Sequence, residues 1–129
     1  MIIGSISENK NIENRISITP EIAKKYISNG FQILLEIDYG LHLGISNDDY
    51  VKEGCKIDSR ENILKQSDIL LQLNFLEDSI LDHLKENHIL IGNFNSIQNH
   101  SNRLFFLHQA SLITLGMLFL MNIYHLIQE

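Results

Sequence analysis

The residue best suited to bind a ligand is Arg15, which lies in the string ENRISITP at residues 13–20. Its guanidinium is a permanently charged planar fork that matches a carboxylate or a phosphate. It follows a predicted first strand, close to the place where parallel α/β sheets bind ligands. On spacing alone, the favoured alternative is a surface ion pair with Glu13 or Glu21.

The other residues with reactive side chains have ordinary structural explanations. None of the six histidines belongs to an HExxH motif or pairs with cysteine at zinc-binding spacing, so we expect no metal site. Cys55 opens a short predicted strand and is expected to be a small buried hydrophobe. Gly40 and Gly44 flank LHL without forming GxGxxG and are interpreted as turn residues.

The composition is that of an ordinary globular domain. The chain has 129 residues and a net charge of −6, so the basic footprint of a nucleic-acid-binding protein is missing. Its single cysteine excludes an internal disulfide and fits a reducing compartment. No basic segment followed by a long apolar one opens the chain, so we expect no signal peptide and a cytoplasmic location.

The elements that must position these side chains alternate between strand and helix. Apolar runs predict strands at residues 1–6, 31–37, 55–57, 68–73 and 88–91. Capping signals predict helices at 20–28, which begins with Thr19-Pro20, and at 46–54, 59–66 and 76–85. This alternation predicts an α/β domain with a parallel sheet between helices on both faces. Ligand-binding residues are then expected in the loops 7–14, 74–75 and 92–95.

The end of the chain has a different character. No Asp, Glu, Lys or Arg occurs between residues 104 and 128. Its length is compatible with a long buried helix, paired in a homodimer, or with one membrane span, although His108, Gln109, Asn122 and His125 are costly in hydrocarbon. We therefore divide the chain into a domain at 1–99 and an apolar tail at 100–129, with membrane association through 104–127 as one alternative.

The order of motifs resembles one family over about residues 1–95. A strand is followed by the ENRxxxTP box, GFQILLEIDYG, GISNDDYVKEGCKI and SDILLQL. This is the pattern of the N-terminal domain shared by alanine dehydrogenase and the alpha subunit of NAD(P) transhydrogenase, with Cys55 in place of the usual alanine. The resemblance implies a flavodoxin-like or Rossmann-like three-layer domain, here with an atypical apolar C-terminal helix.

Positions that distinguish the two branches favour transhydrogenase. In the alanine dehydrogenases, which this chain resembles, a lysine that binds the substrate follows the fourth strand, where this sequence has Asn74. They also place a catalytic histidine after the fifth strand, where this sequence offers Asn95. An enzyme that needs a lysine for a carboxylate and a histidine for acid–base chemistry is poorly served by these amides. Gln72 departs from both branches, which usually have lysine there.

The resemblance implies that this domain forms one wall of an NAD(H) cleft. It further implies that the whole enzyme transfers hydride between NAD(H) and NADP(H) and translocates protons. Arg15 would lie nearest the nicotinamide, and Asn74 and Gln72 are further candidate cofactor contacts. The family continues into a Rossmann domain that is not visible after residue 95, so we expect a truncated or frame-shifted chain. Alone it lacks a phosphate-binding glycine loop and is expected to be inactive and to bind NAD(H) weakly.

The implied partners are a separately encoded remainder of the alpha subunit and a membrane beta subunit, which would place the chain at or in the inner membrane. No nucleic acid is expected as a partner. One alternative is a non-catalytic α/β module that associates through its apolar tail. Another alternative is a fragment similar to alanine dehydrogenase.

Overall fold

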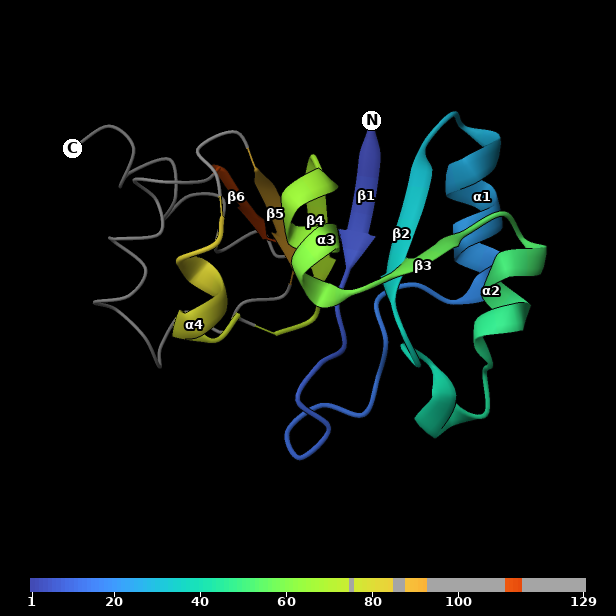
Figure 1. Ribbon diagram of the computed structural model, residues 1–129, viewed down its shortest axis with the longest axis horizontal. Coiled ribbons are helices and arrows are strands. Elements are labelled where there is room, and N and C mark those ends of the chain that lie inside the picture. The colour runs from blue at the N-terminus through green and yellow to red at the C-terminus, as the bar shows by residue number, and fades with distance from the viewer. Residues whose placement is uncertain (75, 85–87, 93–110, 115–129) are drawn as a thin grey trace.

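The structure is a computed structural model that describes residues 1–74, 76–84, 88–92 and 111–114. Its strands are β1 (Ile2–Ser5), β2 (Gln32–Glu36), β3 (Lys56–Asp58), β4 (Ile69–Gln72), β5 (Ile89–Gly92) and β6 (Ser111–Thr114). Its helices are α1 (Pro20–Ser28), the short 3-10 helix η1 (Leu41–Leu43), α2 (Asn47–Lys52), α3 (Arg60–Gln66) and α4 (Asp78–Leu81). Figure 1 shows these elements around one twisted sheet.

The described strands form one parallel sheet in the order β3-β2-β1-β4-β5-β6. Ile3 in β1 stands opposite Ile33 in β2 on one side and Ile69 in β4 on the other. The chain therefore winds outward from β1 in both directions, and the strand order reverses between β1 and β4. In such sheets the carboxyl ends of the two strands at the reversal border the ligand crevice.

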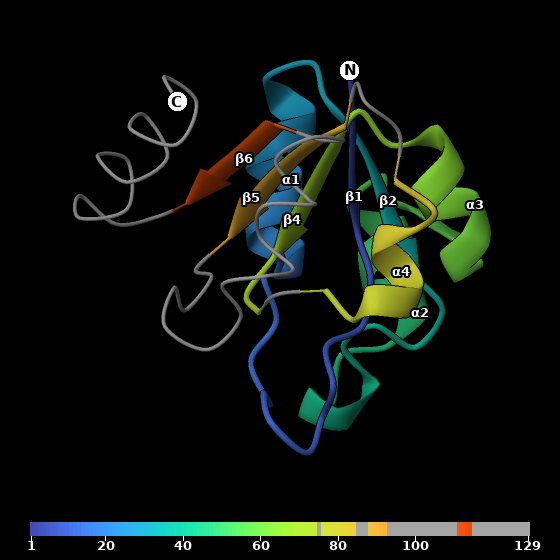
Figure 2. The ribbon, with the colours of Figure 1, turned by 90° about the vertical axis from the view of Figure 1, so that its left-hand side faces the viewer.

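Alternate residues of each strand enter two separate cores. In β2, Ile33 and Leu35 pack with Tyr39, Tyr50 and residues of α1, whereas Leu34 points the other way. Leu34 joins a second core with Leu70 and Leu90 that α3 and α4 cover. Figure 2 shows α1 and α3 on opposite sides of the sheet. Because both faces are buried, the strands have nearly continuous apolar sequences.

The predicted starts of α1, α2 and α3 are confirmed. Thr19 caps α1, since its Oγ1 accepts a hydrogen bond from Ile22 N at 3.3 Å, and Pro20 occupies the first helical position. Ser46 caps α2, and the carboxylate of Asp49 accepts from the Ser46 backbone in return, which completes a capping box. Cys55 is 4% exposed, as expected for a small buried hydrophobe.

Two predicted segments differ in detail. The helix expected at 76–85 is described only over Asp78–Leu81, because Leu76 enters the core before the helix begins and Glu77 takes the capping position. The segment with Gly40 and Gly44, expected to be a turn, contains η1, which Gly44 ends in the left-handed region with φ +78°. Glycine adopts that backbone conformation without steric cost, so the assignment of Gly44 to a turn is confirmed.

The apolar tail contains a strand where a helix was expected. Residues 111–114 form β6 and pair in parallel with β5, Ile113 opposite Ile91. For these four residues the expected helix is wrong, because a short apolar run has no periodicity that separates strand from helix and β5 offers an open edge. The remaining tail and Asn95 lie outside the described residues. In the described part of the chain, no helix is long and apolar enough to span a membrane.

Candidate functional site

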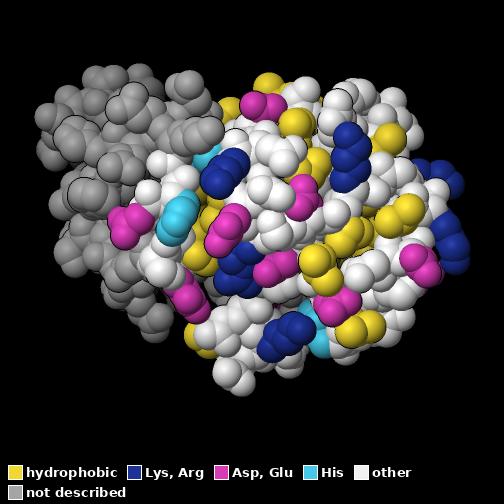
Figure 3. All heavy atoms as spheres, in the orientation of Figure 1, with side chains coloured by type: hydrophobic (Ala, Val, Ile, Leu, Met, Phe, Trp, Pro, Cys, Tyr) yellow, Lys and Arg dark blue, Asp and Glu magenta, His cyan; other side chains and the backbone are white. Residues whose placement is uncertain are grey.

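A cavity of about 180 Å³ opens at the carboxyl ends of β1 and β4, where the strand order reverses. It lies between the loop after β1, the loop after β4 and the first residues of α3 and α4. Acidic and basic side chains are interspersed on the face drawn in Figure 3, which includes α3. The cavity is lined by Ile6, Ser7, Glu8, Asn9, Ile12, Arg60, Gln72, Asn74, Leu76, Glu77 and Ile80.

Gln72 ties the ends of the two strands together. Its side chain is buried, with 2% exposure for the residue. The amide oxygen Oε1 accepts from Ile6 N at 2.8 Å, and Nε2 donates to Ile6 O at 3.1 Å. The side chain therefore imitates one more rung of β-sheet pairing after β1 has ended at Ser5. Gln72 borders the cavity, but its amide is committed to the chain itself, and its expected contact with a cofactor stays a prediction.

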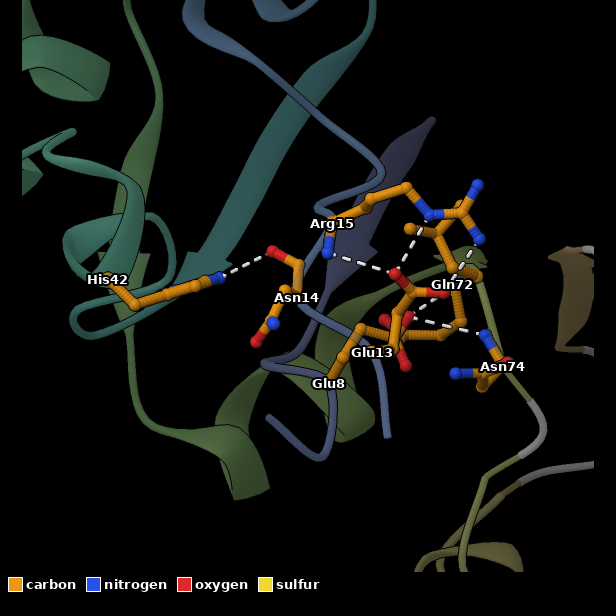
Figure 4. A network of polar contacts seen from close by, with 8 residues as sticks. Glu8, Glu13, Asn14, Arg15, His42, Gln72 and Asn74 are labelled. Carbon is orange, nitrogen blue, oxygen red and sulfur yellow. Dashed lines mark hydrogen bonds and ion pairs between the residues drawn. The ribbon is translucent and has the colours of Figure 1, made fainter. Parts of the chain in front are cut away.

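Glu8 connects the same two loops from the other direction (Figure 4). Its Oε1 accepts from Leu73 N, from Gln72 Nε2 at 3.3 Å and from Asn74 N at 3.4 Å. Burial raises the pKa of the Glu8 carboxyl, and the hydrogen bonds from Leu73 and Asn74 oppose that rise only in part. Asn74 lies at this strand end and borders the cavity, and its expected contact with a cofactor stays a prediction.

A buried polar network runs from Gln72 to the loop after β1, residues 6–19, which carries Arg15 and is called the arginine loop below. Ser5 Oγ lies 3.0 Å from Gln72 Oε1, 2.6 Å from Leu71 O and 2.8 Å from the Tyr39 hydroxyl. Ser17 N then donates to the Tyr39 hydroxyl at 3.1 Å. Hydrogen bonds therefore join the ends of β1 and β4 to the loops after β1 and β2.

Arg15 lies on the exposed part of the loop after β1 and makes the ion pair that its spacing favours. Its Nε and Nη2 donate to the two carboxylate oxygens of Glu13 at 2.8 and 2.7 Å. The Arg15 side chain is 74% exposed, that of Glu13 only 11%. Hydrogen bonding to Arg15 lowers the pKa of Glu13 to about 2. Arg15 is not among the residues that line the cavity, but its fork stays accessible to solvent.

Two neighbours hold the arginine loop in place. Glu13 Oε1 also accepts from the backbone N of Arg15 at 2.9 Å, so one carboxylate fixes both the main chain and the guanidinium. Asn14 O lies 2.8 Å from His42 Nε2, which ties this loop to η1 (Figure 4). Glu13 and Asn14, the two residues before Arg15, therefore both anchor the loop that carries it.

A second carboxylate, unnoticed in the sequence, holds the beginning of the loop after β1. Glu36 Oε2 accepts from Ser7 N at 2.6 Å, and both its oxygens receive the guanidinium of Arg60, at 3.0 and 3.1 Å. Three residues of this site were not identified from the sequence, because none of them belongs to a recognisable motif. They are Glu8, Glu36 and Arg60. Their positions were the available signal, because Glu8 follows a strand, Glu36 ends a strand and Arg60 begins a helix.

The match to known proteins decides the family. The profile of the family described as "Alanine dehydrogenase/PNT, N-terminal domain" matches residues 4–123. This chain belongs to the alanine dehydrogenase/PNT N-terminal domain family. The match includes the ends of β1 and β4 that border the cavity and the loop that carries Arg15, and it extends past residue 95, where the motifs recognised in the sequence end.

Curated relatives of this alanine dehydrogenase/PNT domain align with it over 92 residues, or 71% of the chain. N(5)-(carboxyethyl)ornithine synthase of Clostridium botulinum is 34% identical, and the aligned part is 28% of its length. Alanine dehydrogenase 1 of Staphylococcus aureus is 32% identical, with 24% of its length covered. The chain therefore corresponds to about a quarter of these enzymes.

Solved structures show the same fold. The transhydrogenase of Sinorhizobium meliloti superposes with a TM-score of 0.79 at 22% identity, over 91% of this chain and 35% of that one. An L-alanine dehydrogenase superposes with a TM-score of 0.81 at 18% identity, over 88% of this chain and 32% of that one. Both branches of the alanine dehydrogenase/PNT family thus share this arrangement of strands and helices.

The described residues of the alanine dehydrogenase/PNT domain do not by themselves fit a whole dinucleotide. A cavity of about 180 Å³ is too small for two nucleotides. Glu8 lies just after β1, where a Rossmann domain presents a glycine loop to the pyrophosphate, and its negative charge would repel that group. Among the described residues, no group of three His, Cys, Asp or Glu could hold a metal ion.

Proposed function

We propose that this chain supplies one wall of an NAD(H) cleft in an oxidoreductase of the transhydrogenase branch, which passes hydride between NAD(H) and NADP(H). The observation that carries the proposal is the character of the β4 end. Position 74 is an amide that borders the cavity beside the carboxylate of Glu8. The lysine that the amino-acid dehydrogenase branch uses for its substrate carboxylate is replaced there by a neutral donor and acceptor.

Electrostatics around the cavity support this assignment. Glu8 and Glu77 both line it, and they would repel a carboxylate substrate placed between them. Arg60 also lines the cavity, but both oxygens of Glu36 already receive its guanidinium. A neutral carboxamide, which both donates and accepts hydrogen bonds, suits Asn74 better than a second anion does.

We further propose that the chain needs a nucleotide-binding domain from another part of the enzyme. The Glu8 carboxylate after β1 opposes pyrophosphate binding, and GxGxxG is missing from the sequence. Hydride transfer by this chain alone is therefore not expected. The remainder of an alpha subunit and a membrane beta subunit, which would couple the reaction to proton translocation, belong to the same proposal.

A second candidate is the N-terminal part of an amino-acid dehydrogenase. It is favoured by the relatives at 32% and 34% identity, whose names refer to alanine and to a carboxyethyl derivative of ornithine. The exposed fork of Arg15 could receive a substrate carboxylate if the ligand displaced Glu13. The two candidates differ in which ligand contacts the domain and in whether Arg15 is required for the contact.

Nuclear magnetic resonance of the ¹⁵N-labelled chain separates the candidates. The transhydrogenase proposal predicts that millimolar NADH shifts the Asn74 side-chain amide and backbone signals next to the cavity, and that L-alanine does not. The second candidate predicts shifts with L-alanine around Arg15 that are lost in Arg15→Gln. NADH oxidation by the chain alone, with NADP⁺ as acceptor, would contradict the proposed need for a second domain.

A further inference from the structure

Glu8 occupies an unusual place between two loops of the crevice. It belongs to the loop after β1, yet its Oε1 accepts hydrogen bonds from three nitrogens at the end of β4 (Figure 4). Two of these nitrogens are backbone groups, Leu73 N and Asn74 N. One oxygen atom thus fixes the main chain on which Asn74 is carried.

We propose that Glu8 is a positioning residue, whose carboxylate holds the backbone at Leu73 and Asn74 and thereby directs the Asn74 side chain into the cavity. Gln72 holds the strand end at Ile6, one step before the chain turns away from the sheet. Glu8 takes over where that pairing stops. Without it, the peptide N–H groups of residues 73 and 74 would have no described partner to set their direction.

Ionisation of the Glu8 carboxyl costs stability at this partly buried position, which supports a specific role for its charge. The Glu8 side chain is partly buried, and burial raises the pKa of its carboxyl above the ordinary 4.5. As pH rises from 4.5 through the folded-state pKa, ionisation therefore lowers the stability of the folded chain. A neutral glutamine would accept the same N–H groups without this cost, but its bonds would be weaker than those to a charged acceptor.

The surroundings of Glu8 add charge of both signs. The charged residues near it are Glu13 on its own loop, whose charge raises the pKa of Glu8, and Arg60 and Glu77, which line the same cavity from α3 and α4. Arg60 is held by Glu36, so the two backbone N–H groups and Gln72 Nε2 are the donors that directly stabilise the Glu8 anion. Ionisation of Glu8 and the position of residues 73–74 are therefore coupled.

This inference rests on the proposed function only where it makes Asn74 part of the cofactor wall. The test needs no cofactor, so its failure is distinct from a failure of the proposed function. In the ¹⁵N-labelled full chain, the backbone amides of Leu73 and Asn74 and the Gln72 side-chain amide are followed from pH 3.5 to 8. We expect them to titrate together, with one midpoint above 4.5, and to lose this transition in Glu8→Gln.

A second readout measures the positioning itself. In Glu8→Ala, the Leu73 amide should exchange with solvent faster by on the order of tenfold, and the Asn74 side chain should lose order on the nanosecond timescale. Glu21→Gln, which removes an exposed acid from α1, should change neither property. If Glu8→Ala fails to fold, the titration of the wild-type chain and of Glu8→Gln decides the question.

The proposal would be overturned by amides of residues 73 and 74 that do not titrate in the wild-type chain. A transition that persists in Glu8→Gln would overturn it as well, because another acid would then be responsible. So would unchanged order of the Asn74 side chain in a folded Glu8→Ala. A general loss of stability without the local titration would make Glu8 a merely structural residue.

Discussion

Replacing Gln72 by methionine tests the polar connection between β1 and β4. Methionine has a similar length and volume, so the change leaves no large cavity but removes every hydrogen bond of the amide. The two main-chain groups of Ile6 lose their partner, and Ile6 is only 1% exposed. The buried Ser5 hydroxyl loses one neighbour and keeps Leu71 O and Tyr39.

The magnitude follows from the two groups of Ile6. A buried main-chain donor or acceptor left without a partner costs about 1–3 kcal/mol, so two cost about 2–6 kcal/mol. Water from the adjoining cavity can partly solvate them, which favours the lower half of that range, about 3 kcal/mol. For a domain of this size, such a loss lowers the melting temperature by about 10 °C.

Urea denaturation followed by circular dichroism measures this difference. Gln66→Met is the matched control, because Gln66 is exposed at the end of α3 and the same substitution there should change stability by less than about 0.5 kcal/mol. An equal slope of free energy against urea in both variants would show that they unfold the same structure. A loss below about 1 kcal/mol in Gln72→Met would refute the reasoning that Gln72 satisfies buried main-chain groups.

Three further outcomes test other parts of the structure. Gly4→Ala should cost about 2–3 kcal/mol in urea denaturation, because its new Cβ would lie 2.0 Å from Ser67 Oγ, and Ser67→Ala in the same chain should restore part of the loss. Arg15→Gln should raise the pKa of Glu13 from about 2 towards 4.5 in a carboxyl ¹³C titration. The wild-type chain should lose the contribution of Glu13 to stability as pH falls from 4.5 to 2, and the variant should lack this pH dependence. Cys55, whose pKa burial raises to about 11, should resist a thiol reagent at pH 8 until urea unfolds the chain.

The local signals in the sequence were sufficient for most of the fold. Thr19-Pro20 predicted the start of α1 because a cap and the first helical turn depend on adjacent residues alone. The apolar runs predicted the strands because each is buried on both faces. The same logic failed for Ser111–Thr114, where four residues are too few to show a period and the pairing edge of β5 decides.

The candidate site was only partly predictable, for a related reason. The loops after β1 and β4 were expected to border the ligand crevice, and both line the cavity. The contacts that organise the site join residues far apart in the sequence. Glu8 and Leu73, for example, are separated by 65 positions. No local pattern encodes such a contact. The expected binding role of Arg15 also depends on a partner outside the loop, and it stays a prediction.

The central position of β1 has a consequence for how the chain is made. Ile6 and Gln72 are 66 positions apart, so β1 can pair with β2, and β2 with β3, well before β4 has left the ribosome. During that interval one edge of an apolar central strand has no neighbour, and unpaired edges of this kind promote aggregation. Nascent chains that stall between residues 58 and 69 should therefore need a chaperone, and the crevice should be among the last features to form.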